Sequence, residues 1–393
     1  MNISFILFYY LPEKTTQHYL YQPLIDKLLS QGHTVNVITP NQTRGLSKEE
    51  IKQYQKIKKE NVNGVNVYRI NAFTYNPNRF NKFKLLLRYL SVSFLLPRKL
   101  KNIKSDVIFT QTNPPIFLAY FVSKWAKRKK IRLVYNVQDL YPDNIFRPSS
   151  IFYHLTNPFK LKTLQSSDSI ITISETMKKT LLTKINDETK IKVIYNFAIS
   201  EYQSKAHEEI VRTRLKIDKT KFNVIYAGNI GYVQDLDVLL RAAELTKDNN
   251  HIVYHIVGEG SQVERIRNKI ITLNLQNVFF HPMQTVEDAV YLYHLADVNI
   301  ISILPHVIRT ALPLKVSSCL EAKKPIVFIG LEDEIDEKWK NQHIITINKR
   351  DYHKLAKTLS ELSINPRIEV TYNNEMFDRE QNINSYIEEI LGR

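Results

Sequence analysis

Residues 222–258 read FNVIYAGNIGYVQDLDVLLRAAELTKDNNHIVYHIVG, and this stretch decides the fold. It opens on an apolar run, passes through a loop with two glycines, continues with the helical pattern DLDVLLRAAELT and closes on a second apolar run. Strands that are apolar throughout are typical of parallel sheets covered by helices on both faces. The stretch therefore predicts a strand–loop–helix–strand unit of an α/β protein.

The first 38 residues repeat this pattern with ISFILFYY, YLYQPLIDKLLSQG and TVNVIT, and Gly32 stands where a left-handed helix cap is expected. The chain of 393 residues is too long for one ordinary core. Residues 196–221 interrupt the pattern, so we expect the domain junction there. Further apolar runs predict strands at 106–110, 132–137, 168–173, 191–195, 277–281, 298–303 and 325–329.

The predicted organisation is a Rossmann-like domain over residues 1–196, a second over 197–365, and a C-terminal helical segment, 366–393, that packs back on the first domain. Ligands of doubly wound sheets bind outside the carboxyl ends of the strands. We therefore expect one site to be formed by the loops at 9–18, 138–147, 228–234, 258–261 and 304–315.

The charge of the chain is distributed unevenly. The net charge is +16. Residues 1–200 hold 31 Lys+Arg and 12 Asp+Glu, which is +19, and the remaining 24 and 27 give −3 for residues 201–393. Such asymmetry predicts an anionic partner for the first half. Residues 79–104 and 116–132 are basic, aromatic-rich and free of acidic residues, as in helices that lie on a membrane surface. The alternative is a solvated basic face over ordinary core helices.

Several classes of protein are disfavoured by the sequence. The single cysteine, Cys319, excludes an intrachain disulfide and fits a reducing cytosol. No secretory signal and no apolar stretch of about 18 residues is visible, so we expect no transmembrane helix. No nucleic-acid-binding signature accompanies the positive charge, and we expect no nucleic-acid partner. The histidines lack metal-site spacing, so no metal is predicted.

Six pieces of sequence carry a resemblance to a known family. The chain resembles the GT-B glycosyltransferases of family 4, in particular the group that builds bacterial capsule, O-antigen and similar surface polysaccharides. The resemblance lies in YYLPE with QGHTVNVIT (9–13 and 31–39), NVQDLYPDNI (136–145), SDSIITISETMKKTLL with VIYNF (167–182 and 193–197), VIYAGNIGYVQDLDVLLRAA (224–243), IVGEG (256–260) and LPLKVSSCLEAKKPIV (312–327).

The resemblance implies a GT-B fold, in which two Rossmann-like doubly wound domains face each other across an interdomain cleft. It also implies a retaining, metal-independent transfer of a sugar from a nucleotide-sugar donor, with UDP favoured, to a lipid-linked saccharide. The enzyme would then be cytoplasmic and peripheral on the inner face of the cell membrane. Two alternatives stay open: a non-hydrolysing UDP-sugar epimerase, and a catalytically silent scaffold of a polysaccharide assembly complex.

A nucleotide-sugar donor leaves as a diphosphate, and glycine loops before helices can bring backbone amides close to such an anion. Gly228, Asn229 and Gly231 form one such loop, and Gly258 and Gly260 form a second. The alternative is that these glycines are turns after strands. The resemblance adds three donor-binding candidates from the 304–327 segment, which are Arg309, Lys315 at the Lys of the "PSK" motif, and Ser318.

The sequence departs from the wider family at several donor positions. Many relatives carry a pair of glutamates that would fall on Thr310 and Ser318 here, and an Arg and a Lys that would fall on Asn229 and Gln234. Glu321, one helical turn after Ser318, is an alternative ribose contact. These departures motivate the scaffold alternative.

In the first domain the candidate catalytic residue is Asp139, in the loop after a buried strand, where a carboxylate could orient an acceptor hydroxyl and support positive charge on the sugar. The alternative is a loop aspartate that caps a turn. Asp235 and Asp237 resemble a metal-binding Asp-x-Asp pair, but their place at a helix start favours dipole complementation. Acceptor-side candidates are Glu13, Thr16, His18 and Gln138.

Overall fold

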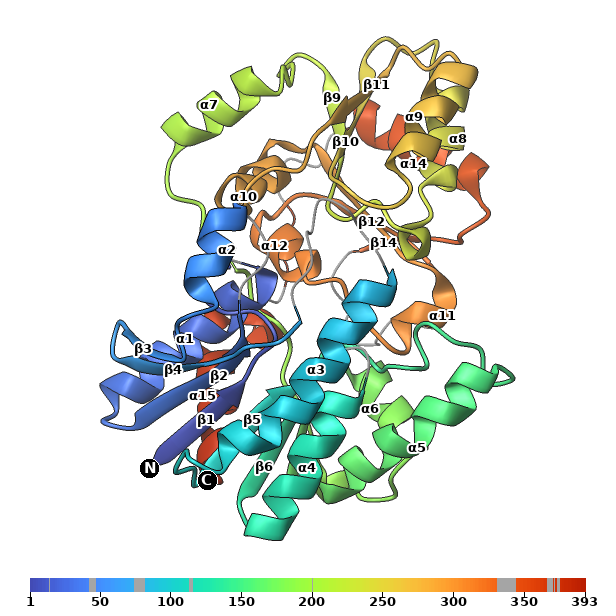
Figure 1. Cartoon of the computed structure of the whole chain (residues 1–393). Helices are drawn as coiled ribbons and strands as arrows, with labels where there is room; N and C mark the ends of the chain where they lie inside the picture. The colour runs from blue at the N-terminus through green and yellow to red at the C-terminus, as the bar shows by residue number, and fades with distance from the viewer. Residues whose placement is uncertain are drawn as a thin grey trace. The chain divides into compact units, whose positions relative to one another are not determined.

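The computed structural model describes residues 1–13, 15–41, 47–73, 82–112, 116–199, 201–330, 344–365, 370, 372 and 375–393. The chain folds into two compact α/β units (Figure 1). Unit 1 comprises Met1–Tyr195 with Arg379–Arg393, and unit 2 comprises Asn196–Asp378. The division after Tyr195 falls next to the boundary expected from the sequence at residue 196.

The sheet of unit 1 has eight strands in the order β3-β4-β2-β1-β5-β6-β7-β8. All neighbours pair in parallel except β3 and β4, which form an antiparallel pair. Successive strands are added in one direction from β1 to β4 and in the other from β5 to β8, so the strand order switches between β1 and β5, as in a Rossmann fold. The strands are β1 (Asn2–Ile6), β2 (Thr34–Pro40), β3 (Lys59–Val62), β4 (Val65–Ile70), β5 (Val107–Gln111), β6 (Arg132–Val137), β7 (Ser169–Thr172) and β8 (Ile191–Val193).

Helices of unit 1 cover this sheet. Gly32 follows α1 with a φ of +80°, the left-handed cap that the sequence predicts. The C-terminal helix α15, red in Figure 1, packs against α1 and β5, and its Tyr386 is fully buried. The helices are α1 (Thr16–Ser30), α2 (Lys48–Tyr54), α3 (Lys82–Leu100), α4 (Phe117–Lys129), α5 (Ile151–Ser166), α6 (Glu175–Leu182), the 3₁₀ turn η1 (Glu188–Lys190) and α15 (Arg379–Leu391).

The two basic segments of unit 1 form α3 and α4, and residues 79–81 and 113–115 lie outside the described residues. On α3, Val92, Leu96 and Leu100 are buried, and on α4 Leu118 and Val122 join the same core cluster. The apolar stripe of both helices therefore packs into the domain, as in the core-helix alternative that the sequence leaves open.

The sheet of unit 2 has six parallel strands in the order β11-β10-β9-β12-β13-β14, which is the 3-2-1-4-5-6 order of a Rossmann fold. Its core contains the buried residues Val224, Tyr226, Leu240, Ile256 and Leu355. The strands are β9 (Phe222–Ala227), β10 (Ile252–Val257), β11 (Val278–His281), β12 (Val298–Ser302), β13 (Ile326–Ile329) and β14 (Ile345–Ile347).

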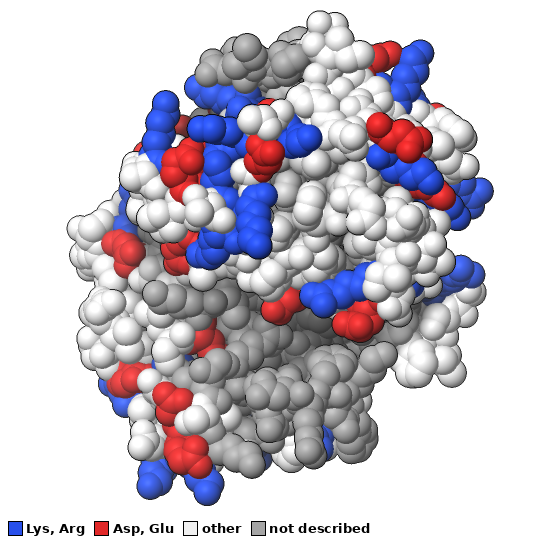
Figure 2. All heavy atoms as spheres, turned by 90° about the horizontal axis from the view of Figure 1, so that it is seen from above, with Lys and Arg blue, Asp and Glu red and all other residues white. Residues whose placement is uncertain are grey.

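The helices of unit 2 are α7 (Lys205–Arg214), η2 (Tyr232–Gln234), α8 (Asp237–Leu245), α9 (Val263–Thr272), α10 (Val286–Leu295), α11 (Pro305–Ile308), α12 (Lys315–Glu321), α14 (Tyr352–Ile364) and η4 (Glu375–Phe377). In the part of the chain that the structure describes, no helix is both long and apolar enough to cross a membrane. Figure 2 looks down on the face where α7, α8 and α9 lie in Figure 1, and there basic and acidic side chains are interspersed.

Candidate functional site

The switch point of unit 2 lies between β9 and β12, and two predicted donor residues meet at its edge. Gly228 follows β9, and Lys315 is the first residue of α12. The Lys315 Nζ donates a hydrogen bond to the carbonyl of Ala227 at 3.2 Å and lies 3.6 Å from the centroid of the Tyr226 ring. Burial lowers the pKa of the Lys315 ammonium to about 8. A cation is thereby held directly beside the glycine loop.

The two glycine loops pack against each other through their backbones. The Gly228 N–H donates to the Val257 carbonyl at 2.9 Å, and the Ile230 N–H donates to the Glu259 carbonyl at 2.7 Å. A Cβ on Gly258 would lie 1.9 Å from the Gly228 oxygen, and one on Gly260 would lie 2.3 Å from the Ile230 oxygen. Both positions therefore require glycine because another backbone approaches them.

This packing changes what the first glycine loop can offer a phosphate. The Gly228 amide donates to the last residue of β10 and the Ile230 amide to the second loop, and the Gly231 N–H donates to the Gln234 side chain at 3.1 Å. Asn229 also donates to the Gln234 oxygen, at 3.2 Å. In this arrangement three of the amides that the sequence suggests for anion binding already have protein acceptors. Among the donor candidates, Lys315 is the one that places a positive charge beside this loop.

The other donor candidates occupy different environments. Arg309 is exposed at the end of α11, whereas Ser318 is buried within α12. The Thr310 hydroxyl donates to the Val307 carbonyl at 3.0 Å. Glu321 ends α12 and lines a cavity of about 840 Å³ with Asn223, near the start of β9. This cavity lies at the opposite end of β9 from Gly228, and the ribose contact by Glu321 stays a prediction.

In unit 1 the acceptor-side candidates Gln138 and Asp139 follow the carboxyl end of β6. Gln138 donates to Asn136 at 3.3 Å and to the hydroxyl of Tyr386 at 3.4 Å, so α15 helps to hold this loop. Asp139 is solvent-exposed. Desolvation by the surrounding protein nevertheless raises the pKa of its carboxyl to about 6. A carboxyl with such a pKa can be ionised at neutral pH and titrate just below it.

The first strand–helix loop supplies the remaining candidates. Glu13 is buried, Thr16 is exposed at the start of α1, and His18 lies in the first turn of that helix. A residue of β4 helps to hold this loop, because the Arg69 side chain donates to the Leu11 carbonyl at 2.5 Å. β1 and β6 are separated only by β5, so the two loops leave the same sheet edge roughly 10 Å apart.

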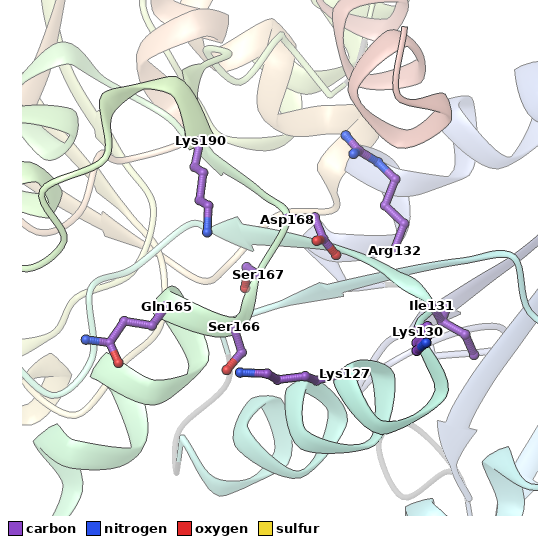
Figure 3. A pocket seen from close by; sticks show the side chains of 9 residues that line it. All are labelled: Lys127, Lys130, Ile131, Arg132, Gln165, Ser166, Ser167, Asp168 and Lys190. Atoms are coloured by element: carbon purple, nitrogen blue, oxygen red, sulfur yellow. The ribbon is translucent and has the colours of Figure 1, made fainter.

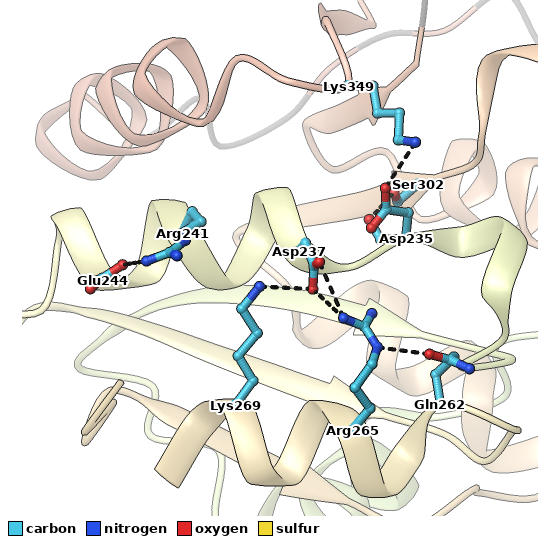
Figure 4. Close-up of polar contacts among 9 residues, drawn as sticks. All are labelled: Asp235, Asp237, Arg241, Glu244, Gln262, Arg265, Lys269, Ser302 and Lys349. Atoms are coloured by element: carbon cyan, nitrogen blue, oxygen red, sulfur yellow. Dashed lines mark hydrogen bonds and ion pairs between the residues drawn. The ribbon is translucent and has the colours of Figure 1, made fainter. Parts of the chain in front are cut away.

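The Asp-x-Asp pair of unit 2 is engaged in ion pairs (Figure 4). Asp237 accepts from Arg265 at 2.9 Å and lies 3.0 Å from the Lys269 Nζ, and Asp235 lies 3.1 Å from the Lys349 Nζ. Asp237 thereby joins α8 to α9, and Asp235 joins the segment before α8 to the segment after β14. Among the residues that the structure describes, no group of three His, Cys, Asp or Glu is arranged to hold a metal.

A second cavity, of about 520 Å³, lies at the amino ends of β6, β7 and β8 in unit 1. Figure 3 shows the side chains of Lys127 and Lys190 pointing towards Ser166 and Ser167. Each cavity lies at the amino ends of the strands of its own unit, whereas the candidate loops follow the carboxyl ends. They are therefore separate from the positions at which Rossmann-like sheets bind nucleotides.

Two family models match the chain over most of its length. The model described as Glycosyltransferase Family 4 matches residues 22–200, and that described as Glycosyl transferases group 1 matches residues 207–375. The chain belongs to the family 4 glycosyltransferases, and it is a glycosyltransferase of GT-B type. The fold and the enzyme class predicted from the sequence are confirmed.

Individual relatives agree with this assignment. The chain is 24% identical over 326 residues to WcaI of Escherichia coli (strain K12), a candidate colanic acid biosynthesis glycosyl transferase, with 79% of each chain covered. The structure of HepE from Anabaena in complex with UDP and glucose matches with a TM-score of 0.69 and 16% identity, covering 100% and 99% of the two chains. WaaG, a glycosyltransferase involved in lipopolysaccharide biosynthesis, matches with a TM-score of 0.65 and 12% identity over 100% of both chains.

Proposed function

We propose that this enzyme is a retaining glycosyltransferase that moves a sugar from a UDP-sugar to a lipid-linked saccharide in bacterial surface polysaccharide biosynthesis. The observation that carries the donor side is the Lys315 ammonium, fixed at the Gly228 loop by Ala227 and Tyr226. The choice of UDP is supported by HepE, whose structure contains that nucleotide. The choice of acceptor is supported by WcaI and WaaG, which are named for colanic acid and lipopolysaccharide biosynthesis.

Each unit has one chemical task in this proposal. As the sugar leaves, negative charge grows on the diphosphate, and Lys315 neutralises it with an ammonium already in position. Asp139 acts from unit 1, where its carboxylate orients the acceptor hydroxyl and supports positive charge on the sugar ring. Because a fixed cation serves the leaving group, the reaction is proposed to need no metal.

We also propose that the enzyme works in the cytoplasm on the inner face of the cell membrane. A lipid-linked saccharide is presented at the bilayer surface, so an enzyme that acts on it gains from residing there. The positive charge of residues 1–200 is suited to anionic lipid headgroups.

The first test is calorimetric titration of UDP, GDP, ADP and CMP into the protein with EDTA present. Binding of UDP is expected, and it should be lost in Lys315→Ala but kept in Lys247→Ala, whose lysine is exposed elsewhere on unit 2. If folded protein binds none of the four nucleotides, with or without magnesium, the donor site is refuted and the silent scaffold is favoured.

A turnover assay then tests the reaction itself. The enzyme is incubated with UDP-sugars and a lipid-linked acceptor, and the anomeric configuration of the product is determined by NMR. Retention of the donor configuration in a glycosylated acceptor is expected. Release of a free epimer without acceptor would instead establish the epimerase alternative, and an inverted linkage would overturn the retaining mechanism.

A further inference from the structure

Four large apolar side chains stand exposed close together in unit 1: Ile145, Ile151, Phe152 and Leu155, here called the apolar platform. Their exposed fractions are 58%, 68%, 59% and 60%. They are half of the eight large apolar side chains that are exposed in the described part of unit 1, and they fall within eleven residues. An exposed apolar cluster of this kind marks a surface that contacts a membrane, another protein or a ligand.

The apolar platform rests on a rigid base. Beneath it, Asp143 forms an ion pair with the buried Lys160 and a second one with Lys184 at 3.2 Å. The Tyr153 hydroxyl donates to the same carboxylate at 3.3 Å, which joins the start of α5 to the preceding turn. Above this base the rings of Phe146 and Phe152 stack with centroids 5.6 Å apart. These part-buried polar contacts fix the turn and the start of α5 that carry the exposed apolar side chains.

Aromatic contacts continue from this region across two further helices. Phe159 of α5 contacts Phe117 and Tyr120 of α4, with ring centroids 4.9 and 5.0 Å apart. Phe121 of α4 contacts Phe94 of α3 at 6.0 Å, and Phe94 is itself 62% exposed. The helices α3, α4 and α5 lie side by side in that order and share this aromatic strip.

The charge of these three helices indicates what covers them. Lys82–Leu100, Phe117–Lys129 and Ile151–Ser166 contain no acidic residue at all. Exposed cations flank the aromatic strip on each helix: Lys84 and Arg98 on α3, Lys124 on α4, and Lys162 on α5. Aromatic and aliphatic side chains bordered by lysine and arginine fit the interface of an anionic bilayer, where rings enter the headgroup layer and cations pair with phosphates.

The position of the apolar platform in the chain links it to the acceptor side of the site. Residues 138–155 run from the carboxyl end of β6 through Asp139 and the Asp143 base to the first turns of α5. One short segment thus carries both the candidate catalytic carboxylate and the exposed apolar side chains. Contact with a bilayer here would keep the Asp139 loop close to the headgroups that bear a lipid-linked acceptor.

We propose that the apolar platform inserts into the interfacial layer of an anionic membrane and docks unit 1 through α3, α4 and α5. The idea rests on the proposed function in one respect, the lipid-linked acceptor. It also adds to the sequence-based view, because the inserting residues belong to α5 and its preceding turn, outside both basic segments recognised from the sequence.

The test is co-sedimentation of the full chain with vesicles of phosphatidylglycerol and phosphatidylcholine. The double variant Phe152→Ser/Leu155→Ser leaves the charge unchanged and should weaken partitioning at least about tenfold. The matched control is Ile271→Ser, which truncates a side chain of 76% exposure on α9 of unit 2 and should have no effect. Equal partitioning of the double variant and the parent would overturn the proposal.

A spectroscopic readout reports insertion itself. Phe152→Trp should give a fluorescence blue shift with anionic vesicles, and Ile271→Trp should not. If ultracentrifugation instead shows a dimer that dissociates in the double variant, while vesicles produce no blue shift, the apolar platform is an interface between two copies and membrane insertion is refuted.

Failure of the proposed function remains distinguishable from failure of this docking surface. UDP titration without vesicles is expected to be the same in the double variant and the parent. Vesicle binding that behaves as expected, in a protein that transfers no sugar to lipid-linked acceptors, would refute the proposed acceptor and leave the docking surface supported. Transfer to a lipid-linked acceptor without vesicle binding would support the proposed acceptor and refute the docking surface.

Discussion

The Lys315 ammonium lies 3.6 Å from the centroid of the Tyr226 ring, and the hydroxyl of the same tyrosine donates to the Asn229 carbonyl at 2.6 Å. Tyr226 is fully buried at the end of β9. Tyr226 therefore joins the two parts of the donor site: the face of its ring contacts the cation, and its hydroxyl binds the glycine loop. Within this site Tyr226 is a positioning residue, because it acts through Lys315 and Asn229.

Substitutions at Tyr226 separate these two connections. Tyr226→Phe keeps the ring beneath the ammonium and loses the hydrogen bond, so UDP affinity is expected to fall only a few-fold. Tyr226→Leu removes both contacts, and loss of a desolvated cation–π contact should weaken UDP binding a further ~10-fold. Calorimetry on variants whose folding is checked by thermal unfolding measures both effects. Equal affinities for the two variants would show that the ring does not position Lys315.

The pH dependence of donor binding follows from the lowered pKa of Lys315, about 8. Below this value the ammonium is charged and attracts the diphosphate, and above it the neutral amine does not. UDP affinity is therefore expected to decline as pH rises from 7 to 9, approaching ~10-fold per unit above the pKa. Lys315→Arg keeps a permanent charge and should abolish the decline. A parent protein whose affinity is flat over this range would contradict the role given to Lys315.

The raised pKa of Asp139, about 6, predicts a second titration on the opposite side of neutrality. The proposed mechanism uses the carboxylate, which becomes protonated as pH falls through about 6. The kcat/KM should therefore drop on acidification, by ~10-fold per unit below the pKa. Asp139→Asn should lower kcat by ~10²-fold or more and remove the acidic limb of the profile. An Asn variant with the parental rate and profile would exclude Asp139 from the chemistry.

The sequence contained most of the fold because its signals were local. Apolar runs of five to eight residues separated by helical patterns predicted most of the strands, and Gly32 predicted its helix end. The antiparallel pair β3–β4 was missed although a signal was present. Residues 61–67 read NVNGVNV, and Asn63 and Gly64 both have positive φ, at 51° and 85°, as in a two-residue hairpin turn.

The site was less predictable because its contacts are long-range. Nothing in the spacing of the sequence shows that Gly228 and Ile230 would donate to the 257–259 backbone, or that the Asn229 and Gln234 side chains would bind each other. The link between Tyr226 and Lys315 spans 89 positions and depends on the parallel order of the sheet. Exposure of the apolar platform likewise follows from which face of α5 packs inwards, and periodicity alone did not single it out.

The backbone contact between the two glycine loops yields a last prediction, which concerns stability. A Cβ at Gly258 would lie 1.9 Å from the Gly228 carbonyl oxygen, whereas one at Gly32 would have no neighbour within 4 Å. Gly32→Ala therefore measures only the strain of a left-handed backbone, ~1 kcal/mol. Gly258→Ala adds overpacking and should lower the free energy of unfolding by a further ~1–3 kcal/mol.

Calorimetric unfolding of the two variants and the parent measures the difference, and UDP titration follows its effect on the site. Because the Gly258 substitution pushes on the loop that carries Gly228, it should also weaken UDP binding, while Gly32→Ala should leave binding unchanged. Equal destabilisation by both substitutions would mean that the loops separate without cost. The amides of Gly228 and Ile230 would then be available to a phosphate, and the donor site would be wider than the one described above.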